Sequence, residues 1–159
     1  MIIRKPIPKD FDAIYHILNE WLEQPYLDEL FQLIKEENIQ HLDYNRQNFV
    51  LEENNIVIGI GGIADLIPDM KSYAKSDKPG SIKSLYIADK YRGKGYGKKL
   101  LLSLEQILKS EGYTEIILRS AEKFQSTAWD FYIKMGYDKL GVMTIHDDKT
   151  IMAVFSKLI

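Results

Sequence analysis

Three alternating glycines, in the run from Arg92 to Gly97, are the residues of this chain best suited to bind a charged ligand. They stand between an apolar, strand-like stretch and a segment with a strongly helical pattern. Glycine adopts backbone conformations that a side chain forbids, so successive main-chain N–H groups can surround an anion at the start of the following helix. The run therefore predicts a phosphate-binding turn.

The commoner glycine motifs do not fit this run. A Rossmann fingerprint that starts at Gly93 or Gly95 needs its third small residue at Lys98 or Leu100, and a P-loop needs Ser or Thr where Lys99 stands. Upstream, residues 59, 61 and 64 do match the Rossmann spacing, but residues 65–68 follow them instead of a helix. We therefore expect the upstream glycines to be strand residues or part of a bulge.

Five cations crowd the same place: Lys90, Arg92, Lys94, Lys98 and Lys99. They lie at the start of a predicted helix, where the macrodipole disfavours each cation by a few tenths of a kcal/mol. An anionic ligand would offset this cost. The alternative is a basic helix end that water alone solvates.

Composition limits the class of protein. The chain has 159 residues, 45% hydrophobic and 28% charged, which predicts one soluble domain over 1–159. A net charge of −2 gives no general attraction to nucleic acid, so we expect no such partner. The absence of cysteine excludes disulfides, thiolate metal sites and a cysteine nucleophile, and it fits a cytoplasmic location. No apolar run reaches eighteen residues, so we expect neither a signal peptide nor a membrane span.

Hydrophobic periodicity and turn residues predict alternating strands and helices. Two strands joined through Asn54 and Asn55 form an expected hairpin, and residues 68–80 form an expected surface loop. The last of four helices is expected to be capped by Ser126. The predicted strands cover 2–5, 48–53, 56–67, 81–88, 115–120, 139–145 and 150–157, the last two with a turn at Asp147 and Asp148, and the helices cover about 9–20, 26–37, 95–111 and 126–135.

The chain resembles the GNAT superfamily of N-acetyltransferases over nearly its whole length. The family's acyl-coenzyme A signature is Arg or Gln, two residues, Gly, one residue, then Gly or Ala, and it appears here as Arg92, Gly95 and Gly97. The stretch Leu85-Tyr86-Ile87 resembles the strand that precedes that loop.

A second signature carries the same resemblance. In the family it is a helix with Ala, Tyr four residues later, then Gly and an aromatic residue. Here these are Ala128, Tyr132, Gly136 and Tyr137. The resemblance implies an α/β (α+β) fold: a mixed, mostly antiparallel sheet of about seven strands, splayed between strands 4 and 5 and flanked by about four helices.

The resemblance also implies acetyl-coenzyme A as co-substrate. Its pyrophosphate would lie on the main-chain amides of the turn, and its pantetheine arm would run beside the fourth strand. Gln125 stands where the family often has an Asn that binds the cofactor. Its amide is one methylene further from the main chain, and we expect it to make the same contact. The implied cofactor-binding residues are Leu85, Tyr86, Ile87, Arg92, Gly93, Lys94, Gly95, Tyr96, Gly97, Lys98 and Gln125.

In the family the acetyl group passes directly to an amine, which agrees with a chain that has no cysteine. The reaction needs a neutral amine, although an alkyl ammonium has a pKa near 10.4, and it needs a proton donor for the departing thiolate. Tyr132 matches the family's proton-donating tyrosine. The alternative is that Tyr132 only packs at helical spacing.

No residue stands out as the general base. Some family members, including histone acetyltransferases, have Glu on the fourth strand, but the equivalent position here is Ser81. The other candidates are Asp65, Tyr73, Tyr86 and His146. The two remaining histidines, at positions 16 and 41, have no partner at metal-ligand spacing, so we expect no metal site.

Three functions remain open from the sequence. The first is an N-acetyltransferase acting on a primary amine of a small molecule, or on an N-terminus or lysine of a protein. The second is a module that binds acyl-coenzyme A without turnover, which the missing strand-four carboxylate suggests, and the third is a general nucleotide-binding domain. The retained Tyr132 favours the first over the second, and the failed nucleotide motifs count against the third. The acceptor, the base, the acyl length and a homodimer stay open.

Overall fold

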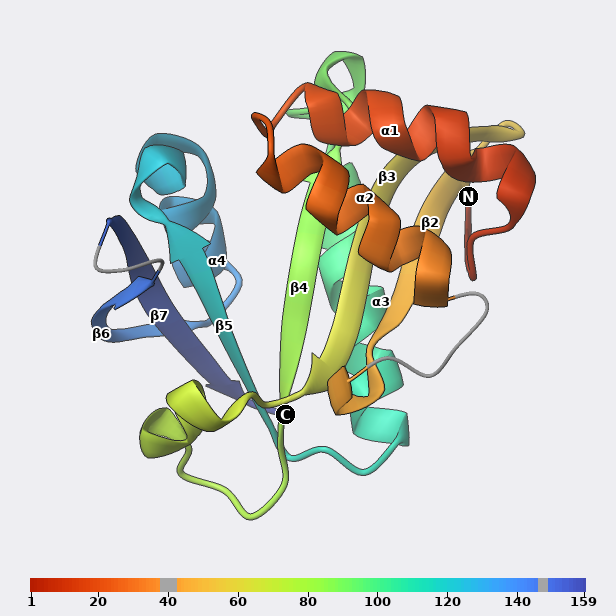
Figure 1. Cartoon of the computed structure of the whole chain (residues 1–159). Helices are drawn as coiled ribbons and strands as arrows, with labels where there is room; N and C mark the ends of the chain where they lie inside the picture. Colours follow the sequence, from red (N-terminus) through yellow and green to blue (C-terminus); the bar gives the residue numbers. More distant parts are fainter. Residues whose placement is uncertain (38–42, 146–148) are drawn as a thin grey trace. The chain divides into compact units, whose positions relative to one another are not determined.

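A computed structural model describes residues 1–37, 43–145 and 149–159 of the chain (Figure 1). His41, His146 and the predicted turn at Asp147 and Asp148 lie outside the described residues. The chain divides into two compact units, which we describe separately: Met1–Asp65 with Ile82–Ile107, and Leu66–Ser81 with Leu108–Ile159. The assignment of 1–159 to a single domain stays a prediction.

The described strands form one mixed sheet. Its antiparallel pairs are β1/β2, β2/β3, β5/β7 and β6/β7, while β4 and β5 run parallel and pair through Pro79 and Gly80 with Glu115 and Ile116. This arrangement confirms the predicted mixed, mostly antiparallel sheet. The strands are β1 (Ile2–Arg4), β2 (Gln47–Glu53), β3 (Ile56–Asp65), β4 (Pro79–Ile87), β5 (Glu115–Ala121), β6 (Asp138–Ile145) and β7 (Thr150–Leu158), in the order β1-β2-β3-β4-β5-β7-β6.

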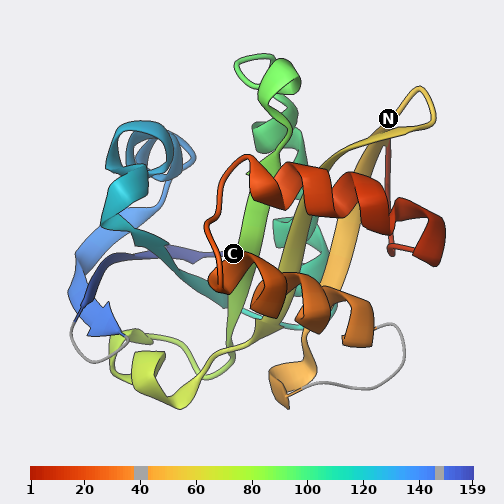
Figure 2. The same cartoon turned by 45° about the horizontal axis from the view of Figure 1, so that its top comes forward.

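The first unit packs helices on both faces of its strands. Helices α1 (Phe11–Asn19) and α2 (Tyr26–Glu37) cover one face of β2 and β3, and α3 (Tyr96–Ser110) covers the other (Figures 1 and 2). A Cβ added to Gly61 on β3 would stand 2.8 Å from the Leu104 side chain of α3, so the glycine lets the helix approach the sheet. Gly59 and Gly61 are strand residues, as predicted.

The hairpin between β2 and β3 forms where the sequence predicts it. Asn54 and Asn55 have φ angles of 51° and 64°, the left-handed conformation that a tight two-residue hairpin turn requires. Glu53 and Ile56 are the paired residues on either side. The hairpin fixes the register of the strand that lies beside β4.

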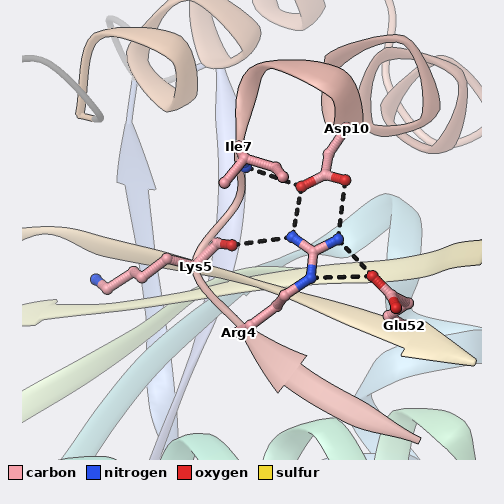
Figure 3. A network of polar contacts seen from close by, with 5 residues as sticks. All are labelled: Arg4, Lys5, Ile7, Asp10 and Glu52. Carbon is pink, nitrogen blue, oxygen red and sulfur yellow. Dashed lines mark hydrogen bonds and ion pairs between the residues drawn. The ribbon is translucent and has the colours of Figure 1, made fainter. Parts of the chain in front are cut away.

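A charged network holds β1 to the start of α1 (Figure 3). The Arg4 guanidinium donates to both carboxylate oxygens of Asp10, at 2.6 and 3.0 Å, and to Glu52 on β2. Asp10 also accepts the Ile7 N–H at 2.8 Å, and only 3% of the residue is exposed. The hydrogen bond from Arg4 lowers the pKa of Asp10, against the opposing effect of burial.

The second unit has a core on each face of its strands. Phe155 on β7 packs against the rings of Trp129 and Tyr132, with centroids 6.3 and 5.5 Å away. Its neighbour Val154 points to the opposite face, as alternation along a strand requires, and joins a buried cluster with Leu66, Met70 and Ile117. The ring of Tyr132 therefore belongs to one of these two cores.

Most predicted strand ends differ from the structure by one or two residues, and three differences have a structural cause. Strand β4 begins at Pro79, two residues earlier than expected, because Pro79 and Gly80 pair with β5. The expected loop 68–80 contains a 3-10 helix at Pro68–Tyr73, whose Met70 is buried. Helix α1 begins at Phe11, after a 3-10 turn at Pro8–Asp10.

The predicted cap at Ser126 is wrong. A single π-helical turn covers Gln125–Trp129, and the regular helix α4 covers Asp130–Lys134. Ser126 lies inside the π-turn, and the residue before that turn, Phe124, makes no side-chain capping bond. Across the residues that the structure describes, no helix is both long enough and apolar enough to cross a membrane.

Candidate functional site

The turn between β4 and α3 has the backbone that the glycine run predicts. Gly93 and Gly95 have φ angles of +72° and +83°, in the left-handed region that favours glycine. A Cβ added at either residue would meet no heavy atom within 4 Å, so the space in front of the turn is open. Gly97 lies in the first turn of α3.

Main-chain donors meet at this turn. The N–H of Lys99 donates to Gly95 O at 3.1 Å, the first hydrogen bond at this end of α3. The N–H groups of Tyr96, Gly97 and Lys98 precede it and have no carbonyl one turn earlier to bind. These donors and the positive end of the macrodipole of a 15-residue helix are features that suit an anion.

Four exposed lysines surround the turn. Lys94 donates from Nζ to Lys90 O at 2.8 Å. Lys90 and Lys94 lie over the Tyr91 ring, and Lys99 lies 5.5 Å from the centroid of Tyr96. Together with Lys98 they give this end of α3 a local positive charge, although the net charge of the chain is −2.

Arg92 differs from the four lysines because it is half-buried and its guanidinium contacts several groups of the first unit. Its Nε donates to Ile87 O at 3.2 Å, and Nη1 lies 3.0 Å from Asp89 Oδ1. Its Cζ lies 3.7 Å from the ring centroid of Trp21, and Nη2 lies 3.6 Å from Glu20 Oε2. The contacts with Glu20 and Trp21 were not predicted, because a contact across 71 residues leaves no periodic or motif signal in one sequence.

The end of β4 leads directly into this turn. Ile87 is buried, while Leu85 and Tyr86 are half-buried, and the Tyr86 ring lies 5.8 Å from that of Trp21. Ser84 just before them has φ of +56°, which interrupts the regular pleat of the strand. Its hydroxyl accepts a hydrogen bond from Arg46 Nη2 at 2.9 Å.

The other two predicted site residues belong to the second unit. Gln125 begins the π-helical turn before α4 and is exposed. It lines a shallow, open hollow together with Glu122, Lys123, Ser126 and Asp130. The Gln125 amide is therefore accessible to a ligand at this turn.

Tyr132 is both a core residue and a titratable group. It is 8% exposed, and its ring contacts those of Phe131, Tyr137 and Phe155 at centroid distances of 5.4–5.7 Å. Burial raises the pKa of Tyr132 to about 12. The phenol therefore stays protonated at neutral pH, which suits a proton donor and not a general base.

The base candidates have structural contacts of their own. Asp65 accepts a hydrogen bond from Asn45 Nδ2 at 2.5 Å, and Tyr73 packs against the cluster that contains Leu66 and Met70. Ser81, expected at the position where some family members have Glu, is 3% exposed. Within residues 1–37, 43–145 and 149–159, no three His, Cys, Asp or Glu side chains are grouped to hold a metal ion.

Comparison with known proteins gives the family. A family model described as "Acetyltransferase (GNAT) family" matches residues 11–137, a span that contains both the glycine turn and Tyr132. The chain belongs to this family. The resemblance predicted from Arg92, Gly95, Gly97 and Tyr132 is thus confirmed at the level of the family.

Individual similarities agree with this membership. The glucosamine 6-phosphate N-acetyltransferase of Trypanosoma brucei brucei is 35% identical over 78 residues, which cover 49% of this chain and 50% of that protein. A solved structure of a putative GNAT acetyltransferase from Desulfovibrio desulfuricans has a TM-score of 0.81 at 13% identity, covering 99% of this chain and 98% of that one. An aminoglycoside 6′-N-acetyltransferase solved with coenzyme A has a TM-score of 0.76 at 17% identity, covering 99% and 97%. The chain spans about half the length of the curated relatives it matches.

Proposed function

We propose that this protein is an N-acetyltransferase that moves an acetyl group directly from acetyl-coenzyme A to an amine of a small molecule or a protein. The observation that carries the proposal is the glycine turn at the start of α3, with two left-handed glycines and open space in front of them. The turn fits a pyrophosphate, because it offers main-chain N–H donors, a positive helix end and nearby lysines.

The resemblance to the family implies which residues would hold the cofactor. The N–H groups from Gly93 to Lys98 would bind the pyrophosphate, and exposed Lys94 and Lys98 would add charge. The main chain of Leu85 to Ile87 would bind the pantetheine amides, and Gln125 would supply a further polar contact. The structure solved with coenzyme A supports this assignment by its fold.

Acetyl-coenzyme A supplies the activated thioester. The protein's part is to hold it, to accept a proton from the amine and to return a proton to the departing sulfur. We assign the last step to the Tyr132 hydroxyl, because a phenol with a pKa of about 12 is fully protonated at the pH of the reaction. A thiol with a pKa near 8.5 leaves fairly readily, whereas an alkyl ammonium with a pKa near 10.4 is almost wholly charged at pH 7 and cannot attack, so proton removal from the amine is the harder demand.

The general base is either water or a side chain that is only a weak base at neutral pH. Asp65, Tyr73 and Tyr86 are the described candidates, and the first already accepts a hydrogen bond from Asn45. A water-mediated route predicts that the rate rises with pH as the free amine becomes more abundant. This dependence separates a water route from a strongly basic side chain, which would give a plateau.

A small-molecule amine is the acceptor class that the similar proteins favour. The names of two of them state glucosamine 6-phosphate and an aminoglycoside as substrates, both amino sugars. A protein amine remains the alternative acceptor. The cytoplasmic location and a homodimer are further predictions, which fractionation and a solution mass would test.

A second candidate function is a sensor of acyl-coenzyme A. Ser81, buried at the position of the family's glutamate, favours it, because no carboxylate on β4 is then available as base. The test is release of free thiol from acetyl-coenzyme A across a panel of amino sugars, polyamines, aminoglycosides and peptides. Thiol release that depends on one amine supports the enzyme, whereas tight binding without release on any amine supports the sensor.

A further inference from the structure

The C-terminal end of α1 is fastened to the loop between β4 and α3 at several points, all within the first unit. Trp21 donates from Nε1 to Ile87 O at 3.0 Å, where β4 ends. Glu20 accepts the N–H of Asp89 at 2.6 Å. These two contacts bind the main chain on both sides of Ala88, at the point where the strand becomes the loop.

Arg92 adds further contacts at the same place, and we call the contacts among Glu20, Trp21, Arg92 and residues 87–89 the clasp. Its guanidinium stacks on Trp21 at 3.7 Å, and its Nε donates to the same Ile87 O that Trp21 binds. Its Nη2 is buried, with Glu20 as the nearest carboxylate at 3.6 Å. The guanidinium is thus surrounded by Trp21, Glu20 and Asp89, not directed freely toward solvent.

This clasp ends one residue before the anion site begins. Gly93, Lys94 and Gly95 are exposed, and an added Cβ at either glycine meets nothing within 4 Å. The turn therefore has few side-chain contacts of its own to hold its N–H groups in one direction. Arg92 is the last anchored residue before it.

We infer that Glu20 and Trp21 are positioning residues for the cofactor turn, and that Arg92 acts as their buttress and not as a ligand of the phosphates. The inference rests on the proposed function, since it concerns how the chain holds the site for acetyl-coenzyme A. Main-chain donors bind an anion well only if they converge before it arrives. The clasp supplies that preorganisation from a helix that precedes the turn by some 70 residues in the sequence.

If Arg92 supports the turn, the effect of its loss on cofactor binding should depend on salt differently than if Arg92 contacts the phosphates. A cation that contacts phosphate through solvent loses most of its effect at high ionic strength. A half-buried stack with hydrogen bonds to the carbonyl of Ile87 is screened less. Lys98 is exposed beside the same turn, so it is the control residue for a solvated cation whose effect is lost at high ionic strength.

The experiment is calorimetric titration of coenzyme A into the whole protein at low and high salt. We expect Trp21→Leu and Arg92→Met each to weaken binding about tenfold at both salt concentrations, the size expected for a lost hydrogen bond and a lost stack. The double variant should bind no more weakly than either single variant, since both remove one clasp. Lys98→Ala should weaken binding at low salt only, and Tyr15→Phe, on α1 but away from the loop, should bind like wild type.

Kinetics separate positioning from a general loss of structure. Trp21→Phe keeps the stack and loses only the N–H, so it should recover part of the affinity. For Trp21→Leu we expect KM for acetyl-coenzyme A to rise about tenfold with little change in kcat, because saturating cofactor restores the turn. A kcat that falls in proportion to the folded fraction would instead show a structural role alone.

The possible failures are distinguishable. If wild type does not bind coenzyme A, or Gly95→Val binds it equally well, the proposed function fails. If wild type binds and Gly95→Val does not, but Trp21→Leu binds like wild type, the positioning role is wrong. If Arg92→Met weakens binding at low salt only, as Lys98→Ala should, Arg92 is a phosphate ligand.

Discussion

At the scale of single residues, burial gives Tyr132 two properties at once. Its ring fills a core with Phe131, Tyr137 and Phe155, as the helical spacing alone predicts. The same burial raises the pKa of its hydroxyl to about 12, because the phenolate would lose its hydration. Packing and proton donation are therefore compatible roles, so the contacts alone do not choose between them, and only a change to the hydroxyl can.

We predict that Tyr132→Phe lowers kcat by about 10²-fold, within the usual range for a general acid, and leaves the affinity for coenzyme A nearly unchanged. Phenylalanine keeps the ring contacts and removes the proton. Steady-state kinetics with an accepted amine and a binding titration measure the two quantities. Full activity in the variant would leave Tyr132 with its packing role alone.

The raised pKa also sets a pH dependence. Because the folded-state pKa of Tyr132 exceeds its ordinary value of 10, its protonated form contributes stability below pH 10, and this is lost as pH rises toward 12. In the assay range of pH 7 to 10 the donor stays protonated, so it causes no alkaline fall in rate.

Gly95 tests the turn at the same scale, because the chain contains a matched glycine. An added Cβ meets open space at Gly95 and at Gly141 on β6, but only Gly95 has a left-handed φ. We predict that Gly95→Val abolishes the thermal stabilisation by coenzyme A, since a branched residue disfavours that φ and blocks the approach of the anion. Gly141→Val should retain it. Both variants are checked for folding by circular dichroism before the titration.

At the scale of elements, local patterns predicted most of the strands and helices along the chain. The Asn54-Asn55 turn predicted a hairpin, and the apolar stripe predicted a helix over about 95–111, which the structure has at Tyr96–Ser110. The predictions that failed concern features that local patterns do not determine. The π-turn at Gln125–Trp129 replaced a cap expected from Ser126, and β4 starts at Pro79 because β5 pairs with it.

The candidate site shows the same division. The positive φ angles of Gly93 and Gly95 could be predicted, because glycine spacing before a helix is a local signal. The clasp of Glu20 and Trp21 on Arg92 could not, since it joins elements that are distant in sequence. Ser84 also gave no signal, because serine has no intrinsic preference for φ of +56°.

The network that joins β1 to α1 carries a prediction of its own. Arg4 is the main partner of the buried carboxylate of Asp10, so Arg4→Met leaves that charge with the Ile7 N–H alone. We predict a loss of about 2 kcal/mol in the free energy of unfolding at pH 7. Urea denaturation measures it, and Lys9→Met, an exposed neighbour of Asp10, should change stability by less than about 0.5 kcal/mol.

The sign of its pH dependence follows from the lowered pKa of Asp10. A carboxyl whose folded-state pKa lies below its ordinary value of 3.8 contributes stability above that value, and the contribution is lost as pH falls through the folded pKa. Wild type should therefore lose stability below about pH 4 more steeply than Asp10→Asn. Equal acid slopes would show that other carboxyl groups control the acid transition.

At the scale of the whole molecule, positive charge is concentrated at one helix end and is not spread over the whole chain. A net charge of −2 coexists with a cluster of lysines at one helix end, so we expect one turn to attract an anion and the chain as a whole not to attract polyanions. A small ligand with a compact phosphate group exploits such a patch, whereas a long nucleic acid would need an extended one. Ligand specificity should therefore depend on the phosphates and not on the adenosine.

The last prediction uses this difference. A ligand that binds only the folded state stabilises it by RT ln(1 + [L]/Kd), or about 2.7 kcal/mol at a hundredfold excess over Kd. For a chain of 159 residues this corresponds to a rise in Tm of about 5–10 °C. We expect coenzyme A and acetyl-coenzyme A to produce this rise in a thermal-shift titration, and adenosine, which lacks the pyrophosphate, to produce none. Because the lysines are exposed, added salt should reduce the rise without removing it, since the main-chain donors remain. An equal response to adenosine would mean that the ligand is held by its base, and the glycine turn would then lose its assignment as the phosphate site.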